Sequence, residues 1–191
     1  MRLSIERKTT KIYPDLKRVV ARFFFNGEAR AKSIIQHVAA MTDEEVDLTV
    51  MPILREFSRR HRNITRIFER HAGRLRHLYP GLQIDYDLLP LKRKLLTGSY
   101  FTNEYSIESA AFFNPCLVED LDQSGLEEGQ RRVIMSFRAV GEGHVSSIAF
   151  RSGVIDKNNE VTLMTPGNYV DEAEVIRNSM YNKDNFFQSA A

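Results

Sequence analysis

The chain has 191 residues, 42% of them apolar and 27% charged, and its net charge of +2 is too small to imply a polyanionic partner by itself. A single cysteine, Cys116, excludes an intramolecular disulfide framework and is compatible with a reducing compartment. No apolar run approaches the length of a membrane span and the charged N-terminus does not resemble a signal peptide, so we expect a cytoplasmic protein without a membrane partner.

The first part of the sequence is predicted to combine short strands with a helix. Leu3 to Ile5 and Val19 to Phe25 have the composition of strands, and Asn26-Gly27 after the second run is a strong turn signal. Glu28 to Ala40 carries an approximate apolar stripe at helical spacing, which predicts a helix.

The next predicted helix has the clearest start signal in the chain. Thr42 followed three residues later by Glu45 is a capping box. Apolar residues then follow helical spacing on one broad face, and the helix is predicted to end at Gly73. Because Pro52 removes a backbone donor, we expect a kink or a break between Leu48 and Pro52.

The far face of this helix is basic. Its members are Arg55, Arg59, Arg60, His61, Arg62, Arg66, Arg70, Arg74 and Arg76. A solvated helix face, a contact with a neighbouring subunit and a footprint for nucleic acid or another anion are the alternatives. No aromatic residues interleave there for base stacking, so a nucleic acid is not the expected partner. His61, His71 and His77 lack carboxylate and cysteine neighbours, so no metal site is predicted.

Two further segments precede the β-rich part of the chain. Asp87 to Leu96 suggests a short helix or an irregular segment around Pro90, broken by Gly98. Tyr100 to Glu108 is polar and aromatic, and it is either a substrate-facing loop or a packed connector.

A β-hairpin is predicted in the second half of the chain. Two β-rich runs, Arg132 to Arg138 and Val145 to Arg151, flank the glycine-containing turn Val140 to His144. Further on, Val161 to Met164 fits a strand after a turn, and Asp171 to Tyr181 fits a short helix.

Polar residues of types that form binding sites stand at the ends of these runs: Asn114, Arg138, Glu142, His144 and Arg151. An asparagine amide both donates to and accepts from a sugar hydroxyl, and an arginine at a strand end suits a phosphate or a carboxylate. Taken singly, each of these residues is more often structural than functional, because Asn-Pro is a common turn and a lone arginine is usually a surface charge. The functional interpretation therefore depends on their clustering.

Four stretches of the sequence resemble glycoside hydrolase family 130: Thr97 to Ser106, Ala110 to Pro115, Asp122 to Leu126 and Ser136 to Ile148. Three N-terminal segments resemble the helical extension of one bacterial branch of that family: Glu6 to Lys8, Arg22 to Phe24 and Arg55 to Asn63. Members of the family are β-mannoside phosphorylases and β-1,2-mannosidases built on a five-bladed β-propeller. These motifs are specific in combination, although none is decisive alone.

The resemblance implies an α+β chain with three parts. Residues 1–96 would form an N-terminal strand-helix extension, residues 97–165 the first part of a β-propeller catalytic domain, and residues 166–191 a polar, truncated tail. A five-bladed propeller needs about twenty strands at four per blade, and this chain supplies about six to eight. We therefore expect the first blade or blades of an incomplete propeller.

The resemblance also implies roles for individual residues. Asn114 matches the family's substrate-binding asparagine in the first blade, and Arg138 matches an arginine that faces the active site. Glu142 and His144 match an adjacent turn, and all four are predicted to be substrate-binding residues. The family's catalytic aspartate lies in a Gly-x-Glu-Asp-Ala-Arg-type segment that is absent here, so the general acid is expected beyond residue 191 and no catalytic residue is assigned.

The resemblance implies that the chain is part of a carbohydrate-active enzyme that acts on β-mannosides by phosphorolysis or hydrolysis. Because glycosyl transfer requires a positioned acid, we expect the chain to be inactive alone. The expected partners are a β-mannoside oligosaccharide, the rest of the propeller or a second copy, and inorganic phosphate as co-substrate if the enzyme is a phosphorylase. No other cofactor is expected. The alternatives are a non-enzymatic interaction module whose arginine-rich helix, residues 55–76, binds a polyanion or a partner protein, and a structural remnant that pairs with a complementary fragment.

Overall fold

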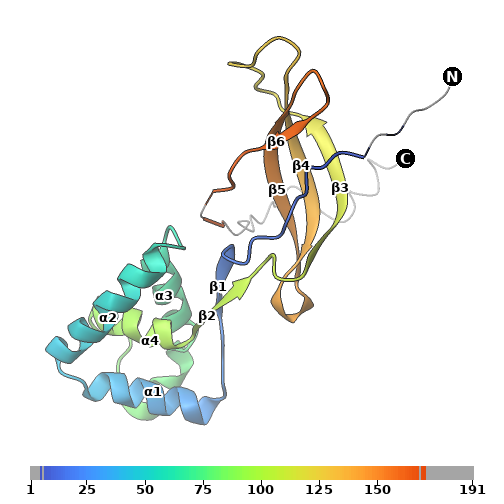
Figure 1. Cartoon of the computed structure of the whole chain (residues 1–191). Helices are drawn as coiled ribbons and strands as arrows, with labels where there is room; N and C mark the ends of the chain where they lie inside the picture. The colour runs from blue at the N-terminus through green and yellow to red at the C-terminus, as the bar shows by residue number, and fades with distance from the viewer. Residues whose placement is uncertain (1–4, 6, 168, 171–191) are drawn as a thin grey trace, which may run out of the picture.

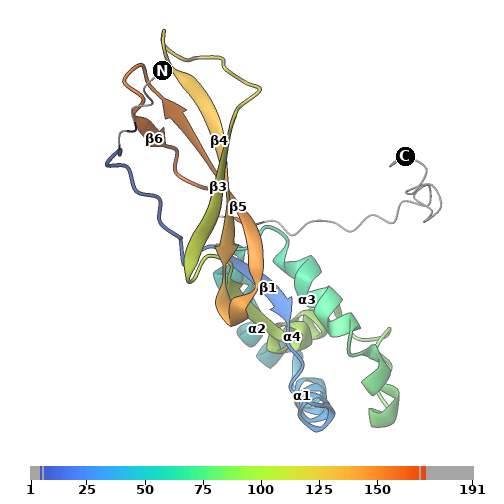
Figure 2. The same cartoon turned by 90° about the vertical axis from the view of Figure 1, so that its right-hand side faces the viewer.

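The computed structural model describes residues 5, 7–167, 169 and 170, and it has a helical half and a sheet half joined by a two-stranded ribbon (Figure 1). The views in Figures 1 and 2 agree that the sheet extends away from the helices. The α+β class predicted from the sequence is confirmed. The predicted helix at 171–181 and most of the predicted strand at 3–5 lie outside the described residues.

The helical half contains α1 (Glu28–Ala40), α2 (Asp43–Ser58), α3 (Ile64–Gly73) and α4 (Leu91–Tyr100), with 3-10 turns at Arg76–Leu78 and Pro80–Leu82. The predicted start of the second helix is confirmed. The hydroxyl of Thr42 accepts the Glu45 N–H at 3.2 Å, and the Glu45 carboxylate accepts the Thr42 N–H at 2.7 Å. This reciprocal pair satisfies two of the donors that a helix start leaves free.

A kink or a break was predicted near Pro52, and the break is wrong. Helix α2 continues through Pro52, and the chain turns instead between Arg59 and Asn63. Leu48 and Pro52 lie on the exposed side of α2, so water can reach the carbonyl group that the proline leaves without a donor. The opposite side holds the helix in place, because Val46 and Val50 are buried in the core.

The predicted break at Gly98 is also wrong, because Gly98 lies inside α4 and is buried. A Cβ atom at this position would stand 1.8 Å from the Phe68 carbonyl oxygen, so the backbones of α3 and α4 touch here. Glycine permits this close crossing. It brings Leu96 of α4 into one cluster with Val50 of α2 and Phe68 of α3.

The ribbon pairs two segments that are distant in the sequence. Strands β1 (Val19–Phe23) and β2 (Thr102–Ser106) run antiparallel, with Phe23 opposite Thr102 and Val19 opposite Ser106. The middle of the segment 100–108 is therefore a strand, and the substrate-facing loop considered for it is wrong. All four helices lie between the paired strands in the chain.

The sheet half is a four-stranded antiparallel meander in the order β3 (Ala111–Glu119), β4 (Arg131–Val140), β5 (Ser146–Ile155) and β6 (Val161–Leu163). The predicted hairpin and last strand are confirmed. Val133, Met135 and Phe137 of β4 are buried on one face, where Ile12 and Phe112 pack against them. Strand alternation puts a second set of apolar side chains on the other face, which we call the open face: Phe113, Val118, Ile148 and Phe150.

The open face exposes each of these four side chains by about half or more, from 49% for Phe113 to 69% for Ile148. No ring of propeller blades is present in the described residues. Within the same part of the chain, no helix is both long and apolar enough to cross a lipid bilayer.

Candidate functional site

The four residues predicted to bind substrate lie near one end of the four-stranded sheet, and we call them the sheet-end cluster: Asn114, Arg138, Glu142 and His144. Asn114 stands in β3 where the register with β4 shifts between Phe113 and Cys116, and its φ angle of 49° is positive. Such a bulge re-aims a side chain out of the regular alternation of the strand. Asparagine tolerates this backbone conformation better than most residues.

Arg138 lies on the neighbouring strand, directly opposite Phe113. Its Nε and Nη2 atoms donate to the Ser146 hydroxyl at 3.3 and 3.2 Å, which holds the guanidinium beside the start of β5. Among the described residues no carboxylate pairs with Arg138, so its charge is available to an anion or a polar ligand.

Glu142 and His144 occupy the turn between β4 and β5. The Glu142 carboxylate accepts the backbone N–H of Ser106 at 3.3 Å, so it helps to fasten the turn to the ribbon. A Cβ atom at Gly141 would meet the Ser106 carbonyl oxygen at 2.4 Å, which shows how closely the turn packs there. His144 is exposed, with a positive φ of 59°. No hydrogen bond between described residues links two members of the cluster.

The structure removes Arg151 from the candidate site residues. It lies opposite Met135 on the covered face of the sheet and is 5% exposed. Its guanidinium donates through both Nη atoms to the Glu108 carboxylate, with the Nη1 bond at 3.2 Å, and stacks 5.1 Å from the centroid of the Phe112 ring. Its role is structural, because strand alternation points it into the core.

Glu108 is fully buried, and it was not anticipated from the sequence. Besides Arg151 it pairs with Nε of Arg18 at 2.9 Å and accepts the backbone N–H of Asp15 at 2.9 Å. We call Arg18, Glu108 and Arg151 the buried ion cluster. It ties together the segment before β1, the loop after β2 and strand β5. No local sequence signal distinguishes Glu108 from the exposed glutamates.

A second carboxylate cluster joins the ribbon to the helices. Glu104 of β2 accepts two hydrogen bonds from Arg60, at 2.8 and 3.0 Å, and its Oε1 atom lies 2.6 Å from Nε2 of His61. Burial acts to raise the pKa of Glu104, but the hydrogen bonds and charges of Arg60 and His61 outweigh it and hold that pKa below its ordinary value. Part of the basic helix face, for which a solvated surface was one alternative, is therefore folded onto the ribbon.

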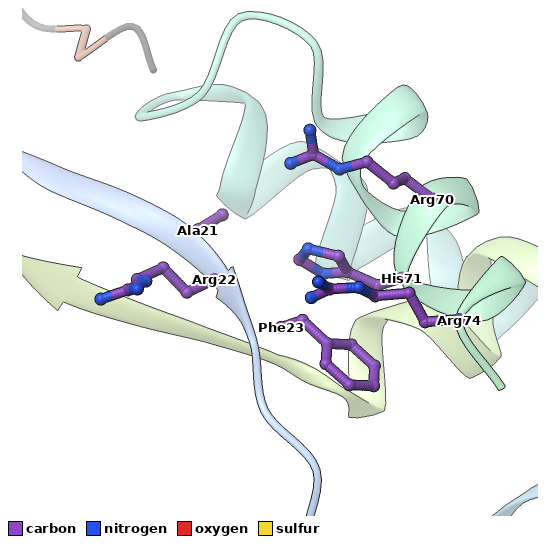
Figure 3. Close-up of a pocket in the computed structure, with 6 residues that line it drawn as sticks. All are labelled: Ala21, Arg22, Phe23, Arg70, His71 and Arg74. Atoms are coloured by element: carbon purple, nitrogen blue, oxygen red, sulfur yellow. The ribbon is translucent and has the colours of Figure 1, made fainter. Parts of the chain in front are cut away.

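A pocket of about 310 Å³ lies between α3 and β1 (Figure 3). We call it the arginine pocket, and its lining residues are Ala21, Arg22, Phe23, Arg70, His71 and Arg74. Figure 3 shows Arg70, His71 and Arg74 projecting from α3 toward β1, with Phe23 beneath Arg74 and Arg22 extending to the other side of the strand. The guanidinium of Arg74 lies 4.8 Å from the centroid of the Phe23 ring.

His71 is 2% exposed, and its protonation state follows from its neighbours. The Thr102 hydroxyl donates to the Gly98 carbonyl at 2.8 Å, so it must accept from Nδ1 of His71 at 2.7 Å. Burial, with the charges of Arg70 and Arg74 added, lowers the pKa of His71 to about 4. At neutral pH the ring is uncharged with its proton on Nδ1.

The sequence had offered one hint of this pocket. Arg70 and Arg74 stand one helical turn apart beside His71, but these residues were grouped with a solvated face. The other wall, β1, is about fifty residues earlier in the chain, and no local pattern connects the two. In the described residues, no group of three or more His, Cys, Asp or Glu side chains is arranged to hold a metal ion.

Comparisons of the chain with protein-family models, with curated proteins and with solved structures give no match. The family resemblance therefore depends on the motifs in the sequence alone.

Proposed function

We propose that this chain is the sugar-binding N-terminal part of a carbohydrate-active enzyme similar to glycoside hydrolase family 130, which acts on β-mannosides by phosphorolysis or hydrolysis. One observation carries the proposal: a four-stranded antiparallel meander brings Asn114 and Arg138 onto neighbouring strands near one end of the sheet. Four antiparallel strands in sequential order are the topology of a single propeller blade.

The residues of the sheet-end cluster suit sugar recognition. The Asn114 amide offers both a donor and an acceptor to vicinal hydroxyls, and it stands at a bulge, a feature found frequently beside binding sites. The Arg138 guanidinium keeps N–H groups beyond those that Ser146 accepts, and these suit a sugar oxygen or a phosphate.

The open face supports the same proposal. Two β-sheets that pack face to face bury the apolar side chains between them. The side chains of Phe113, Ile148 and Phe150 stand ready for such packing but are about half exposed or more in this chain. A neighbouring blade, or a second copy, would cover them.

We assign no general acid to this chain. Glu142 is the carboxylate of the sheet-end cluster, and it already accepts the Ser106 N–H. Glu108 is fully buried between two arginines and cannot reach a substrate. In this proposal the chain binds and orients the sugar, and the acid required for glycosyl transfer is supplied from elsewhere.

The test is the binding of β-1,2-mannobiose, measured by titration calorimetry on the full chain. Asn114→Gly removes the amide without straining the positive φ, and we expect it to weaken binding by about tenfold, the effect of losing one to two hydrogen bonds. Asn63→Ala is the matched control, because Asn63 lies at the start of α3 and its side chain makes no capping hydrogen bond. An unchanged affinity in Asn114→Gly, or no binding by the parent chain, contradicts the proposal.

The alternative function, a polyanion-binding module built on residues 55–76, has less support. Arg59 and Arg60 pair with Glu56, and Arg76 pairs with Asp87, so carboxylates neutralise part of that face. If this alternative holds, a gel-shift assay at low salt will detect nucleic-acid binding that weakens steeply as salt is added.

A further inference from the structure

We propose that the arginine pocket is a binding site for a phosphoryl group. The pocket lies on the helical half, between α3 and β1, and it shares no residue with the sheet-end cluster. The proposal is independent of the sugar-binding role, and it predicts a discrete small-anion site where the sequence suggested only a charged helix face.

Positive charge without a compensating carboxylate is the first observation. Among the described residues no carboxylate pairs with Arg74 or with Arg22, whereas Arg59, Arg60 and Arg76 each have one. Arg70 also lines the pocket but takes part in another interaction, so we base the proposal on Arg74 and His71.

The position of Arg74 is fixed by an aromatic surface. The flat face of its guanidinium lies over the Phe23 ring in a cation–π contact. The N–H groups along the edge of the guanidinium are left for a ligand. A guanidinium edge binds two oxygens of a phosphoryl group at once, and the pairing is strong because both partners are charged.

His71 supplies a second, buried contact point. Its Nδ1 proton is used by Thr102, and its Nε2 atom has no hydrogen-bond partner among the described residues. A ligand in the pocket can supply the partner that Nε2 lacks. The neutral ring accepts a hydrogen bond at Nε2 from a phosphoryl OH, and the protonated ring donates one to a phosphoryl oxygen.

The size of the pocket favours a small anion. Its volume of about 310 Å³ is at the lower end of the range for ligand sites, about 300–1,000 Å³. Ala21 and Phe23 form an apolar side, which excludes part of the water that would otherwise screen the charges. Inorganic phosphate or the phosphate end of a small phosphorylated metabolite fits this combination.

Binding should also be linked to proton uptake. The charged groups beside His71 are Arg70 and Arg74, with the neutral Thr102 from β2, and no carboxylate is among the described residues that line the pocket. Arg22 of β1 also lines the pocket, but its side chain extends to the other side of the strand. An anion placed between the arginines offsets their repulsion and raises the pKa of His71 from about 4. Affinity for sulfate, which stays a dianion in this range, should therefore increase as the pH is lowered from 7 to 5.

The test measures the midpoint of thermal unfolding of the full chain against phosphate concentration, since a ligand of the folded state raises it by mass action. We expect Arg74→Gln to weaken the apparent affinity by at least about tenfold and Arg74→Lys to recover part of it. Arg55→Gln, which removes the same charge from an exposed position on α2, should change it less than about twofold. Equal effects of Arg74→Gln and Arg55→Gln, or no phosphate-dependent shift at 10 mM, overturn the proposal.

The source of the phosphoryl group is separated with glucose 6-phosphate and glucose as probes. Tighter binding of glucose 6-phosphate than of phosphate indicates a phosphorylated metabolite, and similar binding indicates free phosphate. A glucose effect equal to that of its phosphate contradicts the site. Because Asn114→Gly leaves this pocket intact, loss of mannoside binding and loss of phosphate binding are scored separately.

Discussion

The helical half and the sheet half bury their apolar residues in different ways. Helices α2, α3 and α4 surround a core in which Val50, Phe68 and Leu96 are each 0% exposed. The sheet buries one face against the N-terminal segment, while its open face keeps apolar side chains in contact with solvent. The helical half has a closed core of its own, whereas the sheet half has a core on one side only.

Ion pairs join the ribbon to both halves, and on the helical side Phe23 of β1 adds an apolar contact. The buried ion cluster lies on the sheet side of the ribbon, and the Glu104 cluster lies on its helical side. Burying one carboxylate between two arginines costs desolvation energy, and removing the carboxylate leaves the buried Arg151 and the partly buried Arg18 without their counter-charge. Four variants test the contrast between the closed helical half and the one-sided sheet half, from the largest expected loss of stability to the smallest.

Glu108→Gln should cause the largest loss, about 3–5 kcal/mol of unfolding free energy, since it leaves Arg18 and Arg151 without their counter-charge. Urea unfolding followed by far-UV circular dichroism measures it. Glu119→Gln is the control, because Glu119 pairs with Arg131 at 2.9 Å on the surface and should be worth less than about 1 kcal/mol. Equal losses in both variants would show that burial of the cluster has no special weight.

Gly98→Ala should cost about 3 kcal/mol and act on the helical half, because the added methyl group collides with the Phe68 backbone. Gly81→Ala introduces the same methyl group where no atom lies within 4 Å, and its stability should stay within about 0.5 kcal/mol of the parent. The same urea experiment compares the two. A harmless Gly98→Ala would mean that α3 and α4 do not cross so closely.

Thr42→Ala should lower stability by about 1 kcal/mol through loss of the capping box at the start of α2. Thr65→Ala, an exposed position inside α3, is the matched control and should be neutral or slightly stabilising, because alanine is the better helix former. Thermal unfolding distinguishes them, and a neutral Thr42→Ala would contradict the observed cap.

The double substitution Ile148→Thr and Phe150→Thr should change unfolding free energy least, within about 0.5 kcal/mol, because both side chains lie on the open face. The same change should reduce self-association, measured by sedimentation velocity, if the exposed apolar surface is what drives it. A loss above about 2 kcal/mol would instead mean that this face is packed within the single chain.

Sequence signals predicted the elements whose determinants lie within a few residues of each other. Thr42 and Glu45 marked the start of α2, Asn26-Gly27 marked the end of the first strand region, and the turn at 140–144 marked the β4–β5 hairpin. Local backbone chemistry determines these caps and turns, so they could be predicted without knowing which distant segments they pack against.

Features set by distant partners could not be predicted in the same way. Gly98 suggested a helix end, but its role is decided by Phe68, thirty residues earlier, where the two backbones meet. The residues around 102–106 gave no strand signal, because their pairing partner precedes all four helices. Both errors arose from applying a local rule where a long-range contact determines the structure.

The candidate site shows the same division. Asn114 and Arg138 were expected near one another because strand ends and turns gather polar residues, and the structure puts them on adjacent strands. Arg151 matched that pattern equally well, yet its register opposite Met135 turns it inward to Glu108. The arginine pocket was missed because its two walls are brought together only by the ribbon.

The ribbon also gives the molecule a modular layout. Phe23 and Thr102 are paired residues, so the chain leaves the ribbon for the helices and returns to it at the same place. In topological terms the helical half is an insertion into a β-hairpin, with its entry and exit side by side. Elements inserted in this manner can be exchanged or shortened during evolution without a change in the strand order or pairing of the ribbon. The ribbon is therefore a natural splice point for grafting this helical half onto another β-hairpin.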